Sequence, residues 1–295
     1  MTRLAYIGLG SMGMEMARRL ASLDADLVVW NRSDSEAVHE MTRSGAHRAA
    51  SIGEAFDADV VFSMLADDDA ALERFDPVAL EQARPQTVHV NMSTISMDAA
   101  ATLTARHADA GVSYVAAPVL GRPTVAAAGQ LNILAGGPAE AISSVAPYLD
   151  VLGKRTWIVG DDPRTANLVK IAVNYNLIHA LQALAESVTL VEEGGVDGQQ
   201  FIEILTDTAF TGSAYGGYGP MIAARNYSPA LFSLELGLKD LSLVEGAAAS
   251  EGVTLLSTGL LRDVFERALS NPDLTGLDWS SVAEVTRSLT VPTKG

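Results

Sequence analysis

A lysine and an asparagine, Lys170 and Asn174, lie four residues apart in a largely apolar segment, Ala166 to Asn176. On a helix this spacing places both side chains on one face, about one turn apart, so that they can reach one small molecule. An ammonium group in a partly dry site stabilises charge that develops on an oxygen and delivers a proton to it. The alternative is a structural lysine whose stem covers apolar surface.

A glycine-rich segment near the N-terminus has the pattern G-x-G-x-x-G. It follows the apolar run Leu4 to Ile7 and precedes apolar residues at helical spacing,. In that context the first glycine permits a tight turn, the second lets the backbone approach a pyrophosphate, and the third allows close packing of helix on strand. The start of the helix supplies N–H donors. The sequence therefore predicts that a dinucleotide binds at Gly8, Leu9, Gly10, Ser11, Met12 and Gly13.

The end of the next predicted strand indicates which dinucleotide binds. NAD-binding versions carry an acidic residue about 20 positions further on, which holds the ribose 2′-hydroxyl. Here Asn31, Arg32 and Ser33 occupy that place. Arg32 offers a planar cation and its neighbours offer neutral donors, so NADP(H) is predicted to be preferred over NAD(H). A solvated loop arginine is the alternative.

The elements that must position these groups form two regions. Continuous apolar strands near residues 4–7, 27–30, 60–64, 88–91 and 114–115 alternate with helical segments. This order predicts an α/β Rossmann domain with a doubly wound parallel sheet over residues 1–162.

The second region, residues 163–295, is predicted to be a long interdomain helix followed by an all-α domain. Thr165 to Glu193 contains no proline or glycine and ends at Gly194-Gly195,. Helical patterns then cover Gln199 to Leu205, Leu236 to Ser250 and Thr258 to Leu269. The glycine- and tyrosine-rich stretch Phe210 to Pro220 is predicted to be irregular, and such loops often carry function,.

The composition argues against several functions. With 36 acidic and 20 basic residues the net charge is −16, which repels nucleic acid and anionic membranes,. No apolar run approaches the roughly 20 residues that span a bilayer, so a cytoplasmic location is the default. There is no cysteine, and the five histidines lack ligand spacing, so no metal site is predicted,. The acidic run Asp67 to Asp69 is expected to be solvated or to start a helix, and His179 to pack at a helix interface.

Several ordered motifs, which together cover almost the whole chain, resemble the β-hydroxyacid dehydrogenase family. This family includes 3-hydroxyisobutyrate dehydrogenases, tartronate semialdehyde reductases and, more distantly, imine reductases. The motifs are Gly8 to Gly13, Asn91 to Ile95, Ala117 to Val119 with Gly121, Lys170 with Asn174, and Lys239 to Leu241.

The resemblance implies reversible hydride transfer between NADP(H) and a small β-hydroxy acid or the corresponding aldehyde, semialdehyde or ketone. It implies that Lys170 donates a proton to the carbonyl oxygen in reduction, or stabilises the alkoxide in oxidation, and that Asn174 positions the substrate. Met64, Leu65 and Thr94 would line the nicotinamide side, and Lys239 would contact the cofactor from the second domain. Relatives are commonly dimers or tetramers, so a homodimer or homotetramer is expected.

One departure from the family concerns the substrate. Relatives usually follow Ala-Pro-Val with Ser-Gly-Gly, which holds a carboxylate, whereas this chain has Leu120-Gly121-Arg122-Pro123. Leucine donates no hydrogen bond and proline has no N–H. Either Arg122 replaces the lost contacts with a bidentate one, or the pocket accepts a bulkier, less acidic carbonyl or imine. Ser213 is a further substrate-binding candidate, because relatives carry a similar Gly-Ser.

Two other functions compete with the dehydrogenase interpretation. An imine reductase would fit the altered segment, but the imine reductases that resemble this chain often carry another proton donor in place of Lys170. A non-catalytic NADP-binding module is the second alternative, and relatives of that kind have lost the lysine. The presence of Lys170 therefore favours the dehydrogenase over both.

Overall fold

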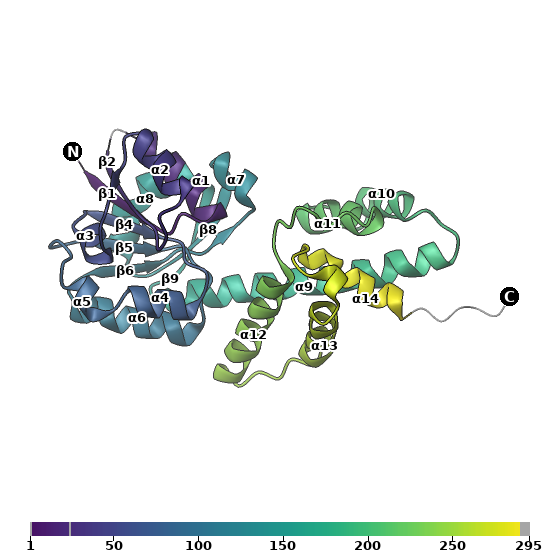
Figure 1. Ribbon diagram of the computed structural model, residues 1–295. Helices are drawn as coiled ribbons and strands as arrows, with labels where there is room; N and C mark the ends of the chain where they lie inside the picture. Colours follow the sequence, from purple (N-terminus) through teal and green to yellow (C-terminus); the bar gives the residue numbers. More distant parts are fainter. Residues whose placement is uncertain (1, 24, 290–295) are drawn as a thin grey trace. The chain divides into compact units, whose positions relative to one another are not determined.

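The computed structural model describes residues 2–23 and 25–289. The chain divides into two compact units, Met1–Lys170 and Ile171–Gly295 (Figure 1). A sheet covered by helices makes up the first unit, and helices make up the second. Within the described residues, no helix is long and apolar enough to cross a membrane.

The sheet of the first unit has the strand order β3-β2-β1-β4-β5-β6-β8-β7, and β9 pairs with β8. Its strands from β3 to β6 pair in parallel, which confirms the predicted doubly wound parallel sheet. The prediction did not include β8, which runs antiparallel to β6 and β7 and extends the sheet. The strands are β1 (Arg3–Ile7), β2 (Asp26–Trp30), β3 (His47–Arg48), β4 (Val60–Ser63), β5 (Val88–Asn91), β6 (Ser113–Ala116), β7 (Val119–Leu120), β8 (Leu131–Gly136) and β9 (Gly153–Gly160).

Helices cover both faces of this sheet. Along β1, Leu4 and Tyr6 join one buried core while Ala5 and Ile7 join the other, as expected where successive side chains of a strand point to opposite faces,. Burial on both faces explains the continuous apolar runs in the sequence. The first core includes residues of α1 (Ser11–Ala21), α2 (Glu36–Arg43), α7 (Pro123–Ala127) and α8 (Ala139–Leu152), and the second those of α3 (Ile52–Phe56), α4 (Asp68–Arg74), α5 (Pro77–Leu80) and α6 (Met97–Asp109).

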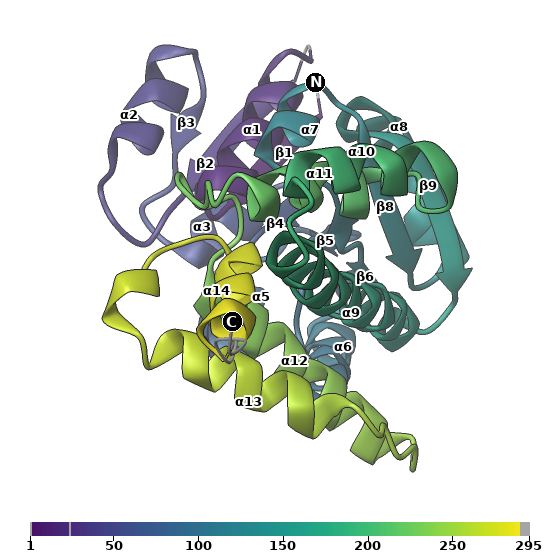
Figure 2. The ribbon, with the colours of Figure 1, turned by 90° about the vertical axis from the view of Figure 1, so that its right-hand side faces the viewer.

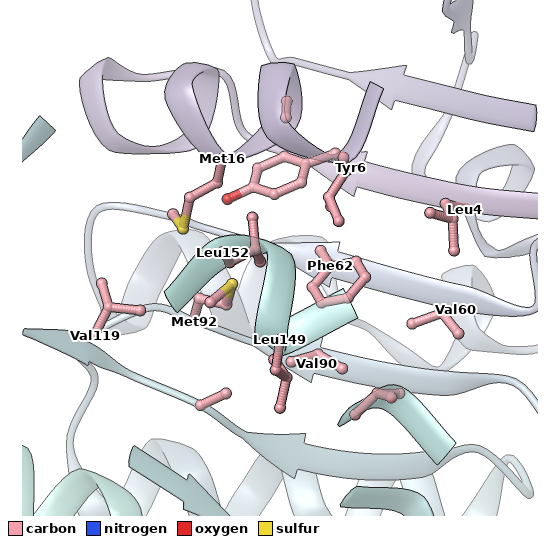
Figure 3. Packing of buried hydrophobic residues seen from close by; sticks show 14 of the residues in the cluster. Leu4, Tyr6, Met16, Val60, Phe62, Val90, Met92, Val119, Leu149 and Leu152 are labelled. Atoms are coloured by element: carbon pink, nitrogen blue, oxygen red, sulfur yellow. The ribbon is translucent and has the colours of Figure 1, made fainter. Parts of the chain in front are cut away.

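The first core fixes β1 against α1. Figure 3 shows Tyr6 of β1 beside Phe62 of β4, and their rings stack with centroids 6.4 Å apart. Met16 of α1 and Leu152 of α8 are fully buried in the same cluster. This packing holds the end of β1 and the start of α1 in place, and the glycine-rich segment connects them.

The second core encloses a chain of polar side chains. His107 Nδ1 lies 2.7 Å from the carbonyl oxygen of Leu103, so it must donate, and its Nε2 is left to accept from His89 Nδ1 at 2.7 Å,. His89 Nε2 lies 2.8 Å from Ser63 Oγ, which also donates to Asn91 Oδ1 at 3.3 Å. Burial disfavours the charged form of both imidazoles. Burial lowers the pKa of His107 to about 4, and burial with the neighbouring His107 lowers the pKa of His89 well below its ordinary value.

The second unit is helical over residues 171–289, and the predicted long helix is confirmed as α9 (Pro163–Glu193), with 31 residues. Helices α10 and α11 pack on each other, as do α12 and α13 (Figure 2). The other helices are α10 (Gly198–Thr208), α11 (Ser213–Ala223), α12 (Leu234–Ser250), α13 (Thr258–Leu269) and α14 (Ala283–Ser288), with short 3-10 helices at Pro272–Leu274 and Trp279–Val282.

The prediction of an irregular stretch from Phe210 to Pro220 is wrong. Helix α11 begins at Ser213, directly after Gly212, which has a φ of 114°. A Cβ on Gly219 would lie 2.8 Å from Ile202 of α10, so the glycine permits close approach of the two helices. Tertiary packing here outweighs the low helix propensity of glycine.

Candidate functional site

The predicted dinucleotide loop joins β1 to α1. Gly8 has a φ of 95°, and its N–H donates to the carbonyl of Trp30 at 2.9 Å. A Cβ on Gly8 would lie 2.3 Å from the oxygen of Met64, and one on Gly13 would lie 2.0 Å from the oxygen of Gly8. A Cβ on Gly10 would meet no atom of the described residues within 4 Å. Gly8 and Gly13 are thus needed for close packing, and Gly10 leaves open space beside the backbone.

The start of α1 suits an anion. The N-cap of α1 is Gly10, which has no side chain that could cap the helix. Within the described chain, the first turn of α1 carries no acidic residue. The first N–H groups of a helix need external partners and favour negative charge. Together with the open space at Gly10, this arrangement fits the pyrophosphate of a dinucleotide.

Asn31 connects the glycine-rich loop to the loop after β2. Its Oδ1 accepts from the N–H of Leu9 at 3.1 Å, and its Nδ2 donates to the carbonyl oxygen of Ser33 at 3.2 Å. The sequence predicted a donor to the cofactor at Asn31. The structure gives its amide a bracing role between two loops, which sequence reasoning missed.

Arg32 lies at a depression of about 420 Å³ beside the end of β2, lined by Trp30, Asn31, Arg32, Arg48, Ala49 and Ala50. Arg48 comes from β3 and is paired in register with Val29 of β2. Sequence reasoning did not find Arg48, because a strand of two residues leaves no recognisable pattern.

The loops that follow β4 and β5 are tied together. Ser93 Oγ accepts from the N–H of Leu65 at 2.8 Å, and Asp68 Oδ1 accepts from the N–H of Ser96 at 2.9 Å. Because the carboxyl ends of parallel strands meet at one edge of a sheet, Met64, Leu65 and Thr94 lie at the edge that carries the glycine-rich loop. Asp67 caps α4 by accepting from the N–H of Ala70, which confirms the acidic run as a helix start.

Lys170 and Asn174 lie one turn apart on α9, as predicted. Asn174 is 4% exposed, and its Nδ2 donates to Asp240 Oδ2 at 2.5 Å. Because a carboxylate only accepts, this contact sets the orientation of the amide. The remaining Oδ1 of Asn174 is buried and has no hydrogen-bond partner among the described residues. An unsatisfied buried acceptor costs about 1–3 kcal/mol, so the site favours a ligand or water that donates there.

The structure adds two polar residues to this region. Asp240, which holds Asn174, also lies beside Lys239, with Lys239 Nζ 3.8 Å from Asp240 Oδ1. Asn167 is 1% exposed, and neither polar atom of its side chain has a hydrogen-bond partner in the described chain. The spacing of Asn167, Lys170 and Asn174 places all three on one helix face. That spacing was a signal for Asn167, whereas nothing in the sequence pairs Asp240 with Asn174.

The segment that departs from the family pattern is a strand-to-helix turn. Leu120 ends β7, Gly121 has a φ of 152°, and Arg122 is the N-cap of α7. Pro123 takes the first helical position, where a missing N–H costs nothing,. Ser213 is exposed at the first position of α11. The substrate-binding roles of Leu120, Gly121, Arg122 and Ser213 remain predictions.

His179 connects α9 to the residue before α13. Its Nε2 lies 2.7 Å from Ser257 Oγ, and its Nδ1 lies 2.9 Å from the carbonyl oxygen of Tyr175. This agrees with its predicted packing role. The described residues contain no cluster of side chains suited to a metal ion.

Two family models match the chain in sequence order. Residues 3–160 match the NAD binding domain of 6-phosphogluconate dehydrogenase, and residues 165–286 match the NAD-binding domain of NADP-dependent 3-hydroxyisobutyrate dehydrogenase.

Individual relatives match over nearly the full length. The Bacillus subtilis oxidoreductase YfjR is 36% identical, over 95% of this chain and 98% of its own. The structure of Mycobacterium tuberculosis 3-hydroxyisobutyrate dehydrogenase with L-serine is 27% identical, with a TM-score of 0.87 over 97% of this chain and 99% of its own. An imine reductase from Pseudomonas sp. is 23% identical, with a TM-score of 0.65 over 97% and 99% of the two chains, and shares the fold.

Proposed function

Since the chain belongs to the β-hydroxyacid dehydrogenase family and is an NAD(P)-dependent hydroxyacid dehydrogenase or reductase, we propose that NADP(H) is its preferred cofactor and Lys170 its proton donor. The proposed substrates are small β-hydroxy acids and the corresponding aldehydes, semialdehydes or ketones. Residues 1–162 would form the cofactor-binding domain and residues 163–295 the long helix with the substrate and oligomerisation domain. We further propose a cytoplasmic homodimer or homotetramer.

The observation that carries this proposal is the polar face of α9. Lys170 offers a cation. One turn away, the buried Oδ1 of Asn174 accepts no hydrogen bond from the described residues. A hydroxyl on the substrate carbon would satisfy that acceptor. Asp240 keeps the Asn174 amide in this orientation, because flipping it would place two acceptors 2.5 Å apart,.

Different residues would bind the cofactor and transfer the proton in the proposed reaction. Gly10 and the start of α1 would hold the pyrophosphate, and Arg32 the 2′-phosphate. A bound nicotinamide cofactor supplies or accepts the hydride. During reduction, the Lys170 ammonium stabilises the charge that builds on the carbonyl oxygen and gives that oxygen a proton. During oxidation, neutral Lys170 takes the proton from the hydroxyl.

A substrate panel tests the proposed activity. Purified protein is mixed with NADPH and a series of aldehydes, semialdehydes, ketones and imines, or with NADP⁺ and β-hydroxy acids, and reduced-nicotinamide absorbance is followed. We expect turnover with a carbonyl compound and with its β-hydroxy product. Turnover with imines alone would establish the imine reductase instead, and inactivity towards every compound would favour the binding module.

We predict that NADP(H) binds more tightly than NAD(H) and that Arg32→Ala removes most of the difference. Arg32 is exposed at the depression beside β2, where no carboxylate of the Asn31 to Ser33 segment can receive a 2′-hydroxyl,. Fluorescence titration of both reduced cofactors measures the preference. Equal affinities in the unaltered protein would contradict the assignment.

We predict that Arg122→Ala weakens carboxylate-bearing substrates selectively. Leu120 replaces the serine that would hold the acid in relatives, and a carboxylate buried without a partner is costly. The decrease in kcat/KM for these substrates should correspond to about 1.5–3 kcal/mol, the usual value of one charged hydrogen-bonding contact. Neutral substrates should be little affected. If acids and neutral compounds respond alike, Arg122 does not select the substrate.

A further inference from the structure

Two arginines from different strands line the depression beside the end of β2. Arg32 follows β2 directly, and Arg48 ends β3, its outer neighbour in the sheet. The parallel pairing of Val29 with Arg48 brings the carboxyl ends of both strands to the same edge. Ala49 and Ala50, which complete the lining with Trp30 and Asn31, have side chains too small to fill the depression.

The charges around Arg48 are compatible with an anionic ligand. Its guanidinium nitrogen lies 3.1 Å from Asp34 Oδ1, and the same oxygen lies 3.0 Å from His39 Nε2. The Glu54 carboxylate, which is also close in sequence, accepts from the N–H of Ala50, and the backbone N–H of Glu54 donates to Ser51 Oγ. Asp34 is thus the acid that pairs with Arg48, and the Arg48 side chain remains 48% exposed.

We propose that Arg48 is a second cationic contact for the 2′-phosphate of NADP(H), and that Asp34 is the counterion that holds its guanidinium at the depression. This inference rests on the proposed preference for NADP(H). A phosphate monoester carries close to two negative charges at neutral pH, more than the single charge of Arg32 balances. The planar fork of a second arginine suits the remaining phosphate oxygens.

Binding of four ligands to the full-length protein tests the proposal without relying on turnover. NADPH is compared with NADH, and adenosine 2′,5′-bisphosphate with adenosine 5′-monophosphate, by fluorescence titration and calorimetry. Arg48→Ala should weaken the two 2′-phosphorylated ligands by about tenfold, as expected for one partly exposed charged contact, and leave the other two unchanged. Asp34→Asn keeps a side-chain oxygen that can accept from Arg48 and hold its guanidinium, but removes a nearby negative charge, so it should strengthen the 2′-phosphorylated ligands about twofold to fivefold,.

Arg43→Ala is the matched control. Arg43 lies on α2, pairs with Glu36 and shares a neighbouring hollow with Arg48, but it does not line the depression beside β2. Its removal therefore changes the net charge near Arg48 without removing a predicted contact. If Arg48→Ala behaves like Arg43→Ala while Arg32→Ala abolishes the NADPH preference, the inference about Arg48 is overturned and the proposed cofactor stands. If the unaltered protein does not prefer NADPH, the proposed cofactor itself fails.

Discussion

Lys170→Ala is expected to fold and bind NADPH but to turn over at least about a hundredfold more slowly, the usual loss when a positioned acid or base is removed. The loss should appear in kcat as well as in kcat/KM, because the lysine acts on charge that develops only in the transition state. Stopped-flow or steady-state loss of NADPH absorbance measures the rate, and fluorescence titration confirms cofactor binding.

Lys154→Ala provides the matched control for this experiment. Lys154 is exposed on β9 and has no role in the proposed site, so its removal takes away the same charge and should leave the rate unchanged. Lys170→Arg separates charge from proton transfer, because a guanidinium stays protonated at working pH. We expect the arginine variant to be nearly as slow as the alanine variant. A near-normal rate in Lys170→Ala would show that this lysine has only a structural role.

The sequence predicted those parts of the fold that depend on local signals. Runs such as Leu4 to Ile7 are apolar without interruption because helices bury both faces of the sheet, and the long helix lacks proline and glycine throughout. Gly8 and Gly13 were assigned their roles from the motif, and the space around each Cβ position agrees with those roles. Local chemistry and tertiary packing favour the same conformation at these places.

Features that depend on pairing between distant segments could not be predicted. Arg48 reaches the depression only because β3 pairs beside β2, and Asp240 meets Asn174 across 66 residues of sequence. In α11 the glycine-rich composition suggested a loop, but Gly219 is where α10 packs closely. In each case the information lies in the partner segment, so no pattern within the segment itself could reveal it.

The buried histidine pair leads to a second large expected effect, which concerns acid stability. In the folded protein His89 and His107 stay neutral, since burial depresses both pKa values, whereas in the unfolded chain they titrate near 6.5. The unfolded state therefore binds more protons below pH 6.5, and stability falls as the pH decreases. The free energy of unfolding has its full value above pH 6.5. It decreases as the pH falls to about 4, where folded His107 also becomes protonated.

By pH 5 the neutral His107 should lower the free energy of unfolding by roughly 2 kcal/mol relative to pH 7.5, and His89, whose pKa is also lowered by burial, should add to this loss,. Urea unfolding followed by tryptophan fluorescence at several pH values measures this loss. Carboxylates contribute mainly below this window, because their ordinary pKa values lie near 4.

The double variant His89→Leu/His107→Leu should remove most of this pH dependence even if it is less stable throughout, since the slope between pH 6.5 and 5 reports only groups that titrate there. His107→Gln is a milder replacement, expected to remove about half of the slope. His47→Gln is the control, because the His47 side chain is 74% exposed in the folded protein. A double variant that retains the full slope would mean that other groups cause the acid sensitivity, and that the pair is not held neutral by burial.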